Sequence, residues 1–254
     1  MVIIIITYMR IAIVLYGAIR ISSIKIKDII KKHNEIFLDA LFRNKTIDIN
    51  FFLCAFEPVE NPQYLWYNTT NEYYYDINNL KKELSELNLN ITYIFTKQPD
   101  LNAIIKTKNG AHAPSLFLLH YYRNFYNYIK DNNLVFDYIV RSRNDMYINI
   151  SKINSYLNDN IMVLSSRCHT NPQCSINDYF YIIPFKNISN FYNISVKQLE
   201  HIIKNSWDQE MCENKLMLLL KGGSLIKNIK DDDVQYLKLD HHNWFVKNGK
   251  KVLK

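Results

Sequence analysis

Residues 11–17 read Ile-Ala-Ile-Val-Leu-Tyr-Gly, and this short run decides the expected fold. Five consecutive apolar residues, most of them β-branched, are typical of a strand that is buried on both faces. Further strand-like runs follow at 48–56, 91–95, 135–140, 162–165 and 179–183, and helical patterns separate them or follow them at 26–41, 80–87, 116–129, 197–204 and 210–220. This alternation predicts an α/β fold with a mostly parallel central sheet flanked by helices on both faces.

Length and composition indicate one compact globular domain. The chain has 254 residues, of which 48% are hydrophobic and 22% charged, and it contains only 5 Gly and 6 Pro. These values exclude a disordered chain, and no fixed-period repeat is present. We therefore expect residues 1–254 to form a single domain, in which 225–254 is irregular or weakly β.

The apolar N-terminus favours a buried strand over a membrane anchor. Arg10 lies in the middle of the apolar stretch, where a charge costs about 2.5–3.5 kcal/mol on membrane insertion. The four cysteines, at 54, 168, 174 and 212, contain no C-x-x-C pair, so we expect reduced thiols rather than a zinc site. The sequence thus predicts a cytoplasmic protein without a stable membrane span.

The formal charge of +7 is compatible with an acidic partner and equally with a lysine-rich solvated surface. A phosphate-bearing small molecule, a polyanionic polymer and an anionic membrane surface all suit this sign. No nucleic-acid-binding motif is present and the basic residues are scattered, so we expect no nucleic-acid partner.

A charged cluster, Arg-Ser-Arg-Asn-Asp at 141–145, follows the predicted strand 135–140 directly. Alternation in an extended segment places Arg141, Arg143 and Asp145 on one side. Guanidinium groups bind phosphate oxygens bidentately, and a carboxylate can hold a divalent ion on the same phosphates. In open α/β sheets ligands bind at the carboxyl ends of strands, where this cluster falls. The alternative is a surface ion-pair cluster that ends the strand.

At these positions the chain resembles a family of GT-A-type glycosyltransferase-like proteins from microbes, algae and large DNA viruses. The resemblance starts with Tyr-Gly-x-x-Arg at 16–20 and continues with Phe-Asp-Tyr-Ile-Val-Arg-Ser-Arg-Asn-Asp at 136–145. Asn-Asp-Tyr-Phe at 177–180 is similar to the family's N-D-x-F, and 213–220 is similar to its E-x-x-L-x-x-x-L helix. Together these motifs extend over roughly residues 10 to 225.

The resemblance implies a GT-A-like fold and transfer of a sugar from a nucleotide-diphosphate sugar to a hydroxyl of a glycan, lipid or protein acceptor. It implies that the phosphates are bound by Gly17, Arg20, Arg141 and Arg143, and that Mn²⁺ or Mg²⁺ is held by Asp145 with His242 as a further ligand. In an inverting transfer the acceptor would be deprotonated by Asp178, with Glu213 as the second candidate or as a residue that binds acceptor hydroxyls. A retaining enzyme would lack this base and would rely on the leaving phosphate. The segment 225–254 would be irregular or form an acceptor or lid segment, and a viral member would act in the host cytoplasm. Arg143 stands where a full D-x-D motif has its first Asp. The carboxylate of the usual ribose contact is therefore missing, and the resemblance does not imply a strict dependence on metal.

Four of these residues also have a purely structural interpretation. Gly17 suits a strand-to-helix turn, Asp178 a turn or cap, Glu213 a solvated helix face, and His242 an ordinary exposed or structural position. Two other function classes stay open for the whole chain. One is a catalytically silent nucleotide- or glycan-binding protein on the same scaffold, and the other is a basic protein of a polyanion or membrane surface.

Overall fold

The computed structural model describes most of the residues that form the central sheet and its helices. The described residues are 7–17, 19, 23–41, 45–57, 76–97, 113–144, 146–150, 157, 161–166, 176–192, 194–205, 225–229, 234–238, 244–247 and 250–253.

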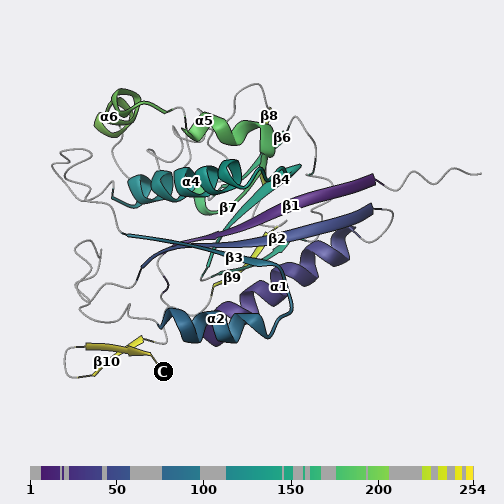
Figure 1. Cartoon of the computed structure of the whole chain (residues 1–254). Coiled ribbons are helices and arrows are strands. Elements are labelled where there is room, and N and C mark those ends of the chain that lie inside the picture. The colour runs from purple at the N-terminus through teal and green to yellow at the C-terminus, as the bar shows by residue number, and fades with distance from the viewer. Residues whose placement is uncertain are drawn as a thin grey trace, which may run out of the picture.

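Seven strands form the central sheet, in the order β3-β2-β1-β4-β7-β6-β8 (Figure 1). Their bounds are β1 Thr7–Tyr16, β2 Lys45–Phe56, β3 Ile91–Thr96, β4 Tyr138–Arg143, β6 Ile161–Ser166, β7 Ile176–Pro184 and β8 Leu225–Ile229. The strands β3, β2, β1 and β4 are mutually parallel, and within this sheet only β7 runs the opposite way. The prediction of an α/β fold with a mostly parallel sheet is confirmed.

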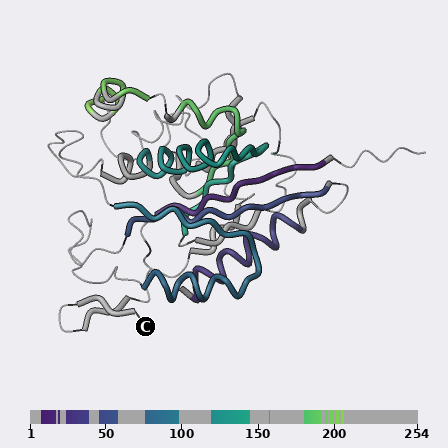
Figure 2. Tube along the Cα trace, in the orientation of Figure 1, coloured from purple at the N-terminus to yellow at the C-terminus, as the bar shows by residue number. Residues whose placement is uncertain are grey.

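Helices cover both faces of the sheet (Figure 2). One face carries α1 (Ser23–Leu41) and α2 (Ile77–Ser85). The other carries α4 (Ala113–Asp131), followed along the chain by the 3₁₀ turn η3 (Phe185–Asn187), α5 (Ile188–Tyr192) and α6 (Val196–Lys204). The predicted helix at 210–220 lies outside the described residues.

The strand pattern explains why both faces are buried. Along β1, Ala12, Val14 and Tyr16 pack toward α4, whereas Ile11, Ile13 and Leu15 pack toward α1 and α2. A strand that is apolar on both sides needs a helical layer on each side. Residues 11–16 of β1 are therefore buried, whereas Tyr8 near the start of the strand is exposed.

Four strands are described within the last thirty residues, which the sequence suggests to be irregular or weakly β. Besides β8, these are β9 (Val234–Lys238), β10 (Trp244–Lys247) and β11 (Lys250–Leu253). β9 pairs antiparallel with β5 (Met146–Ile150), and β10 pairs with β11. Within the described residues no helix is long and apolar enough to cross a membrane.

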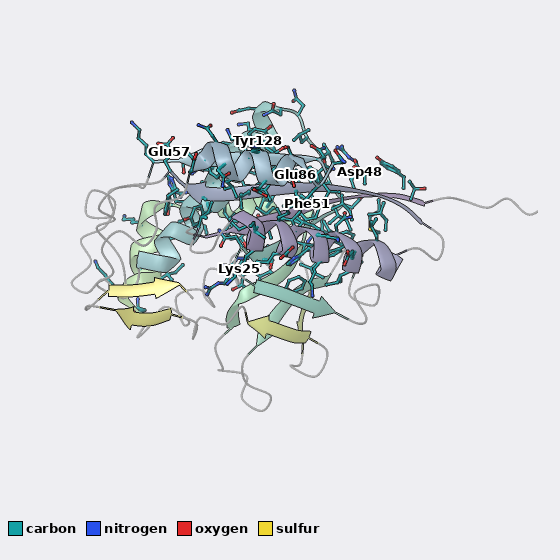
Figure 3. The ribbon with its side chains drawn as sticks, turned by 90° about the horizontal axis from the view of Figure 1, so that it is seen from below. Lys25, Asp48, Phe51, Glu57, Glu86 and Tyr128 are labelled. Atoms are coloured by element: carbon teal, nitrogen blue, oxygen red, sulfur yellow. The ribbon has the colours of Figure 1, made fainter. Side chains whose placement is uncertain are left out.

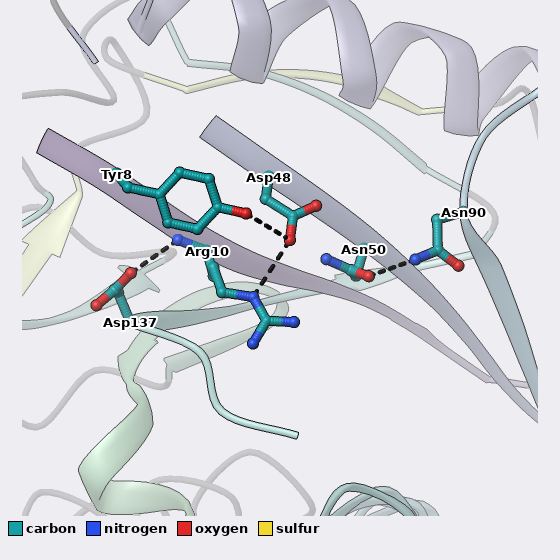
Figure 4. A network of polar contacts seen from close by, with 6 residues as sticks. All are labelled: Tyr8, Arg10, Asp48, Asn50, Asn90 and Asp137. Atoms are coloured by element: carbon teal, nitrogen blue, oxygen red, sulfur yellow. Dashed lines mark hydrogen bonds and ion pairs between the residues drawn. The ribbon is translucent and has the colours of Figure 1, made fainter. Parts of the chain in front are cut away.

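Polar contacts fix the amino-terminal edge of the sheet (Figure 4). Asp48 Oδ2 accepts hydrogen bonds from the Tyr8 hydroxyl and from Arg10 Nε, each at 3.2 Å. The backbone nitrogen of Arg10 donates to Asp137 Oδ2 at 2.7 Å, and the backbone nitrogen of Asp137 donates to the Arg10 carbonyl at 2.8 Å. Asp137, which belongs to the motif at 136–145, thus holds the start of β4 against β1.

Candidate ligand site at the carboxyl ends of β1 and β4

The sheet reverses its direction of growth between β1 and β4. From β1 the chain builds β2 and then β3 on one side, and it returns through α4 to place β4 on the other. Such a switch point opens a crevice outside the carboxyl ends of the strands, where ligands of open α/β sheets bind. Here the two strand ends lie side by side, because Tyr16 is in register with Arg143. This edge is the candidate ligand site.

Gly17 and Asn144 join the two strand ends. Gly17 has φ +129°, a conformation that favours glycine, and its nitrogen donates to the Cys54 carbonyl of β2 at 3.3 Å. Asn144 is buried, its backbone nitrogen donates to the Tyr16 carbonyl at 3.2 Å, and its Nδ2 donates to the Gly17 carbonyl at 2.9 Å. Asn144 therefore holds the ends of β1 and β4 together through the carbonyl groups of Tyr16 and Gly17.

The two arginines of β4 occupy different environments on the α4 side of the sheet. Arg141 is only 4% exposed, and its guanidinium carbon lies 4.7 Å from the centre of the Tyr181 ring and 5.9 Å from that of Tyr16. Arg143, two residues further along the strand, is half-buried at the edge itself. The predicted shared side of Arg141 and Arg143 agrees with this alternation. Contact of either guanidinium with a phosphate stays a prediction.

Ser142 points to the opposite side of β4, where it meets a buried histidine of α1. His33 is 1% exposed, its Nδ1 lies 2.8 Å from the Ile29 carbonyl and its Nε2 lies 3.2 Å from the Ser142 hydroxyl. Burial lowers the pKa of His33 to about 4, although the hydrogen bond to Ile29 opposes this shift. The imidazole is therefore neutral at neutral pH.

Aromatic side chains line the α4 side next to the edge. Tyr16 packs against Tyr122 with ring centres 4.9 Å apart, and Phe56 at the end of β2 stacks on Tyr121 at 4.6 Å. Among the described residues the buried Tyr16 hydroxyl has no hydrogen-bond partner, and burial raises the pKa of Tyr16 well above its usual value. The ring centres of His120 and Phe56 lie 5.9 Å apart. Burial, and to a smaller extent the positive charge of Arg123, lowers the pKa of His120.

Glu57 follows β2 at the same edge of the sheet. It is half-buried, and its nitrogen donates to the Thr96 carbonyl at 2.8 Å. Figure 3 shows Glu57 and Asp48 at opposite ends of β2, so the two carboxylates belong to opposite edges of the sheet. Sequence reasoning treats Glu57 only as the end of a strand. The sequence feature that could have indicated a place for Glu57 at this edge is its position directly after a buried parallel strand.

The topology brings one further predicted residue to this edge. The antiparallel strand β7 begins at the carboxyl edge of β4, because Phe180 is in register with Ser142. Asp178 lies in β7 two residues before Phe180, which places its backbone beside the end of β4. The other predicted site residues, namely Arg20, Asp145, Glu213 and His242, lie outside the described residues.

No metal-ligand group is found within the described ranges. No three side chains of His, Cys, Asp or Glu come close enough there to hold a metal ion. The two predicted ligands, Asp145 and His242, are not among those residues, so the sites at which Mn²⁺ or Mg²⁺ is expected are untested. Cys54, predicted to be a reduced thiol, is free and buried.

The class of protein defined by this geometry is an α/β protein with a candidate ligand site at the switch point of a mostly parallel sheet. No family model matches the chain, and no curated protein sequence matches it either. Several solved structures are similar. The glycosyltransferase GlyE of Streptococcus pneumoniae TIGR4 is 11% identical with a TM-score of 0.39, over 89% of this chain and 46% of the GlyE chain.

Two further solved structures match over most of both chains. A glycosyltransferase involved in the glycosylation of the major capsid of PBCV-1 is 8% identical with a TM-score of 0.39, over 87% of this chain and 82% of that one. HddC from Yersinia pseudotuberculosis, complexed with GMP-PN, is 10% identical with a TM-score of 0.42, over 91% and 93%. Identities and scores of this size do not assign a function to the chain.

Proposed function

We propose that this protein is a glycosyltransferase of the GT-A type that moves a sugar from a nucleotide-diphosphate sugar to a hydroxyl group of a glycan, lipid or protein acceptor. The observation that carries the proposal is the meeting of Gly17, Arg143 and the backbone of Asp178 at the switch-point edge. Sequence motifs separated by more than a hundred residues converge at the place where open α/β sheets bind ligands.

The donor half of the proposed site is cationic. Close backbone approach at Gly17 and the guanidinium of Arg143 suit the diphosphate, with Arg20 and Arg141 as further predicted contributors. Asp145 is proposed to hold Mn²⁺ or Mg²⁺, with His242 as a further ligand, and the ion would neutralise charge on the diphosphate. These groups would act where negative charge develops as the diphosphate departs.

If the transfer inverts the anomeric carbon, the proposed reaction needs one base, whereas a retaining transfer would rely on the leaving phosphate. The acceptor oxygen forms a bond to the anomeric carbon, the bond from that carbon to the diphosphate oxygen breaks, and the diphosphate leaves with the electron pair. The hydroxyl proton passes to a carboxylate, for which Asp178 is the first candidate and Glu213 the second. The β7–β4 register supports Asp178, because it brings the backbone of this residue to the strand end that carries Arg143.

A thermal-shift screen against nucleotide sugars tests the donor site. The wild type is measured with UDP-, GDP-, CDP- and dTDP-sugars in the presence of Mn²⁺, Mg²⁺ or EDTA, beside Asp145→Ala and Arg143→Ala. Lys31→Ala, which removes an exposed positive charge on α1, is the matched control. A donor at 100 times its dissociation constant adds about 2.7 kcal/mol and raises the midpoint by about 5–10 °C.

The outcomes separate the function classes. Stabilisation by one nucleotide family that depends on metal and is lost in Asp145→Ala and Arg143→Ala, but not in Lys31→Ala, supports the donor site. Release of nucleoside diphosphate in the presence of acceptor then separates a transferase from a silent binding protein. If no nucleotide sugar shifts the midpoint, or if Asp145→Ala responds like the wild type, the proposal is refuted.

A further inference from the structure

We infer that His33 is a positioning residue, whose neutral imidazole on α1 holds the carboxyl end of β4 in the conformation that the ligand site requires. The restraint on β4 is independent of which ligand binds. Its consequence for nucleotide binding rests on the proposed function.

The hydrogen-bond pattern fixes one tautomer of His33. A carbonyl oxygen can only accept, so the contact with Ile29 at 2.8 Å requires a proton on Nδ1. In the neutral imidazole Nε2 then carries a lone pair and can accept from the Ser142 hydroxyl at 3.2 Å, which is nearer than the other acceptor of that hydroxyl, the Arg143 carbonyl at 3.4 Å. Both ring nitrogens are thus engaged, and a hydrogen bond joins α1 directly to β4.

The position of Ser142 makes this link consequential. Ser142 lies between Arg141 and Arg143, and it is two residues before Asn144, whose side chain binds the Gly17 carbonyl. The same helix also packs against β5, which begins one residue after Asp145. α1 therefore contacts the strands on both sides of the predicted metal ligand, and His33 is its hydrogen-bonding contact with the first of them.

The apolar surroundings argue that the histidine does more than fill space. The same face of α1 is otherwise built from Ile26, Ile30 and Phe37, all buried. A buried polar side chain is tolerated there only when its hydrogen bonds are made, and the bond to Ser142 is made only for one placement of β4. An isoleucine at this position would pack equally well against several placements, because apolar contacts are not directional.

Amide hydrogen exchange tests the restraint without any ligand. We compare the wild type with Ser142→Ala, His33→Leu and His33→Gln, the last of which keeps a polar group able to meet Ser142. Ile26→Val is the matched control, because it removes one buried methylene from the same face of α1 and leaves the His33 contact intact. The measured quantity is a ratio, namely the exchange rate of the Asn144 amide in each variant divided by its rate in the wild type. The exchange rate of the Ile13 amide in the middle of β1 reports global stability separately.

The expected result is that this ratio rises about fivefold to tenfold in Ser142→Ala and His33→Leu, as expected for one lost hydrogen bond. It stays near the wild-type value in Ile26→Val and rises less in His33→Gln than in His33→Leu. An unchanged ratio in Ser142→Ala, or an equal rise in Ile26→Val, overturns the inference. If His33→Leu does not fold, Ser142→Ala decides alone.

The binding experiment then separates this inference from the proposed function. If the wild type binds a metal–nucleotide-sugar complex, its dissociation constant should rise severalfold in Ser142→Ala and remain unchanged in Ile26→Val. If the wild type binds none of the nucleotide sugars, the proposed function fails while the exchange result still stands. Binding that is unaffected in Ser142→Ala, although the exchange ratio has risen, overturns the positioning role.

Discussion

Acidification provides a direct test of the buried histidine. Burial lowers the pKa of His33 to about 4 in the folded protein, from its ordinary value of 6.5. Between these two values the unfolded chain binds a proton that the folded chain excludes, so the free energy of unfolding falls as the pH falls. Above pH 6.5 the neutral state of His33 costs the folded protein no stability. As the pH falls from 6.5 toward 4, the free energy of unfolding decreases. With 1.36 kcal/mol per pKa unit, the loss amounts to about 3 kcal/mol.

Urea unfolding at pH 7, 6, 5 and 4.5 measures this loss when the wild type is compared with His33→Gln. Carboxylates titrate in both proteins, so their contribution cancels in the difference of the two unfolding free energies. We expect the wild type to lose stability more steeply, by about 2–3 kcal/mol over this range. Parallel curves would refute the reasoning. Should His33→Gln be unfolded throughout, an NMR titration of the wild-type ring replaces it, and a midpoint near 6.5 contradicts the burial argument.

Three further predictions concern the strand ends. Gly17→Ala should lower the free energy of unfolding by about 1–3 kcal/mol in urea titrations, because alanine is strained at φ +129°. A steric clash is not the cause, since the added Cβ would lie at an ordinary van der Waals distance, 3.5 Å, from Asn144 Oδ1. Equal stability of variant and wild type contradicts this. Asn144→Ala should lose about 1 kcal/mol by the same measurement and speed exchange of the Gly17 amide, and an unaltered Gly17 amide would show that the side chain holds nothing. Asp137→Ala should destabilise by about 1–2 kcal/mol, whereas Asp137→Asn, which retains an acceptor for the Arg10 nitrogen, should lose less; equal losses would argue against the hydrogen bond.

Much of the fold follows from the sequence because the central strands are apolar on both faces. Residues 11–15 predict β1, and 48–56 and 91–95 predict β2 and β3 to within a few residues. The end of β4 is less predictable. A strand expected at 135–140 lies at Tyr138–Arg143, because ring faces cover the Arg141 guanidinium and His33 binds Ser142. Charge in the sequence suggests exposure, and only tertiary contacts reveal that this charge is buried.

The candidate site is predictable in position and less so in composition. Strand ends and a charged cluster locate Gly17 and Arg143 at one edge, which the register confirms. Asn144 and His33 are missed as functional residues for different reasons. Asn144 has no local pattern of its own, since its partners are backbone groups of another strand. His33 falls at helical spacing among isoleucines, and the one available signal is a histidine on an otherwise apolar face.

The reciprocal hydrogen bonds between Arg10 and Asp137 act as a register lock. Displacement of β4 by one residue would exchange the two faces of the strand, moving both guanidiniums toward α1 and Ser142 toward α4. The lock and the ligand edge are separated by the length of β4, about 17 Å at 3.3 Å per residue. A substitution at Asp137 that impaired ligand binding would therefore report on strand alignment, and it would be no evidence that this carboxylate touches a substrate.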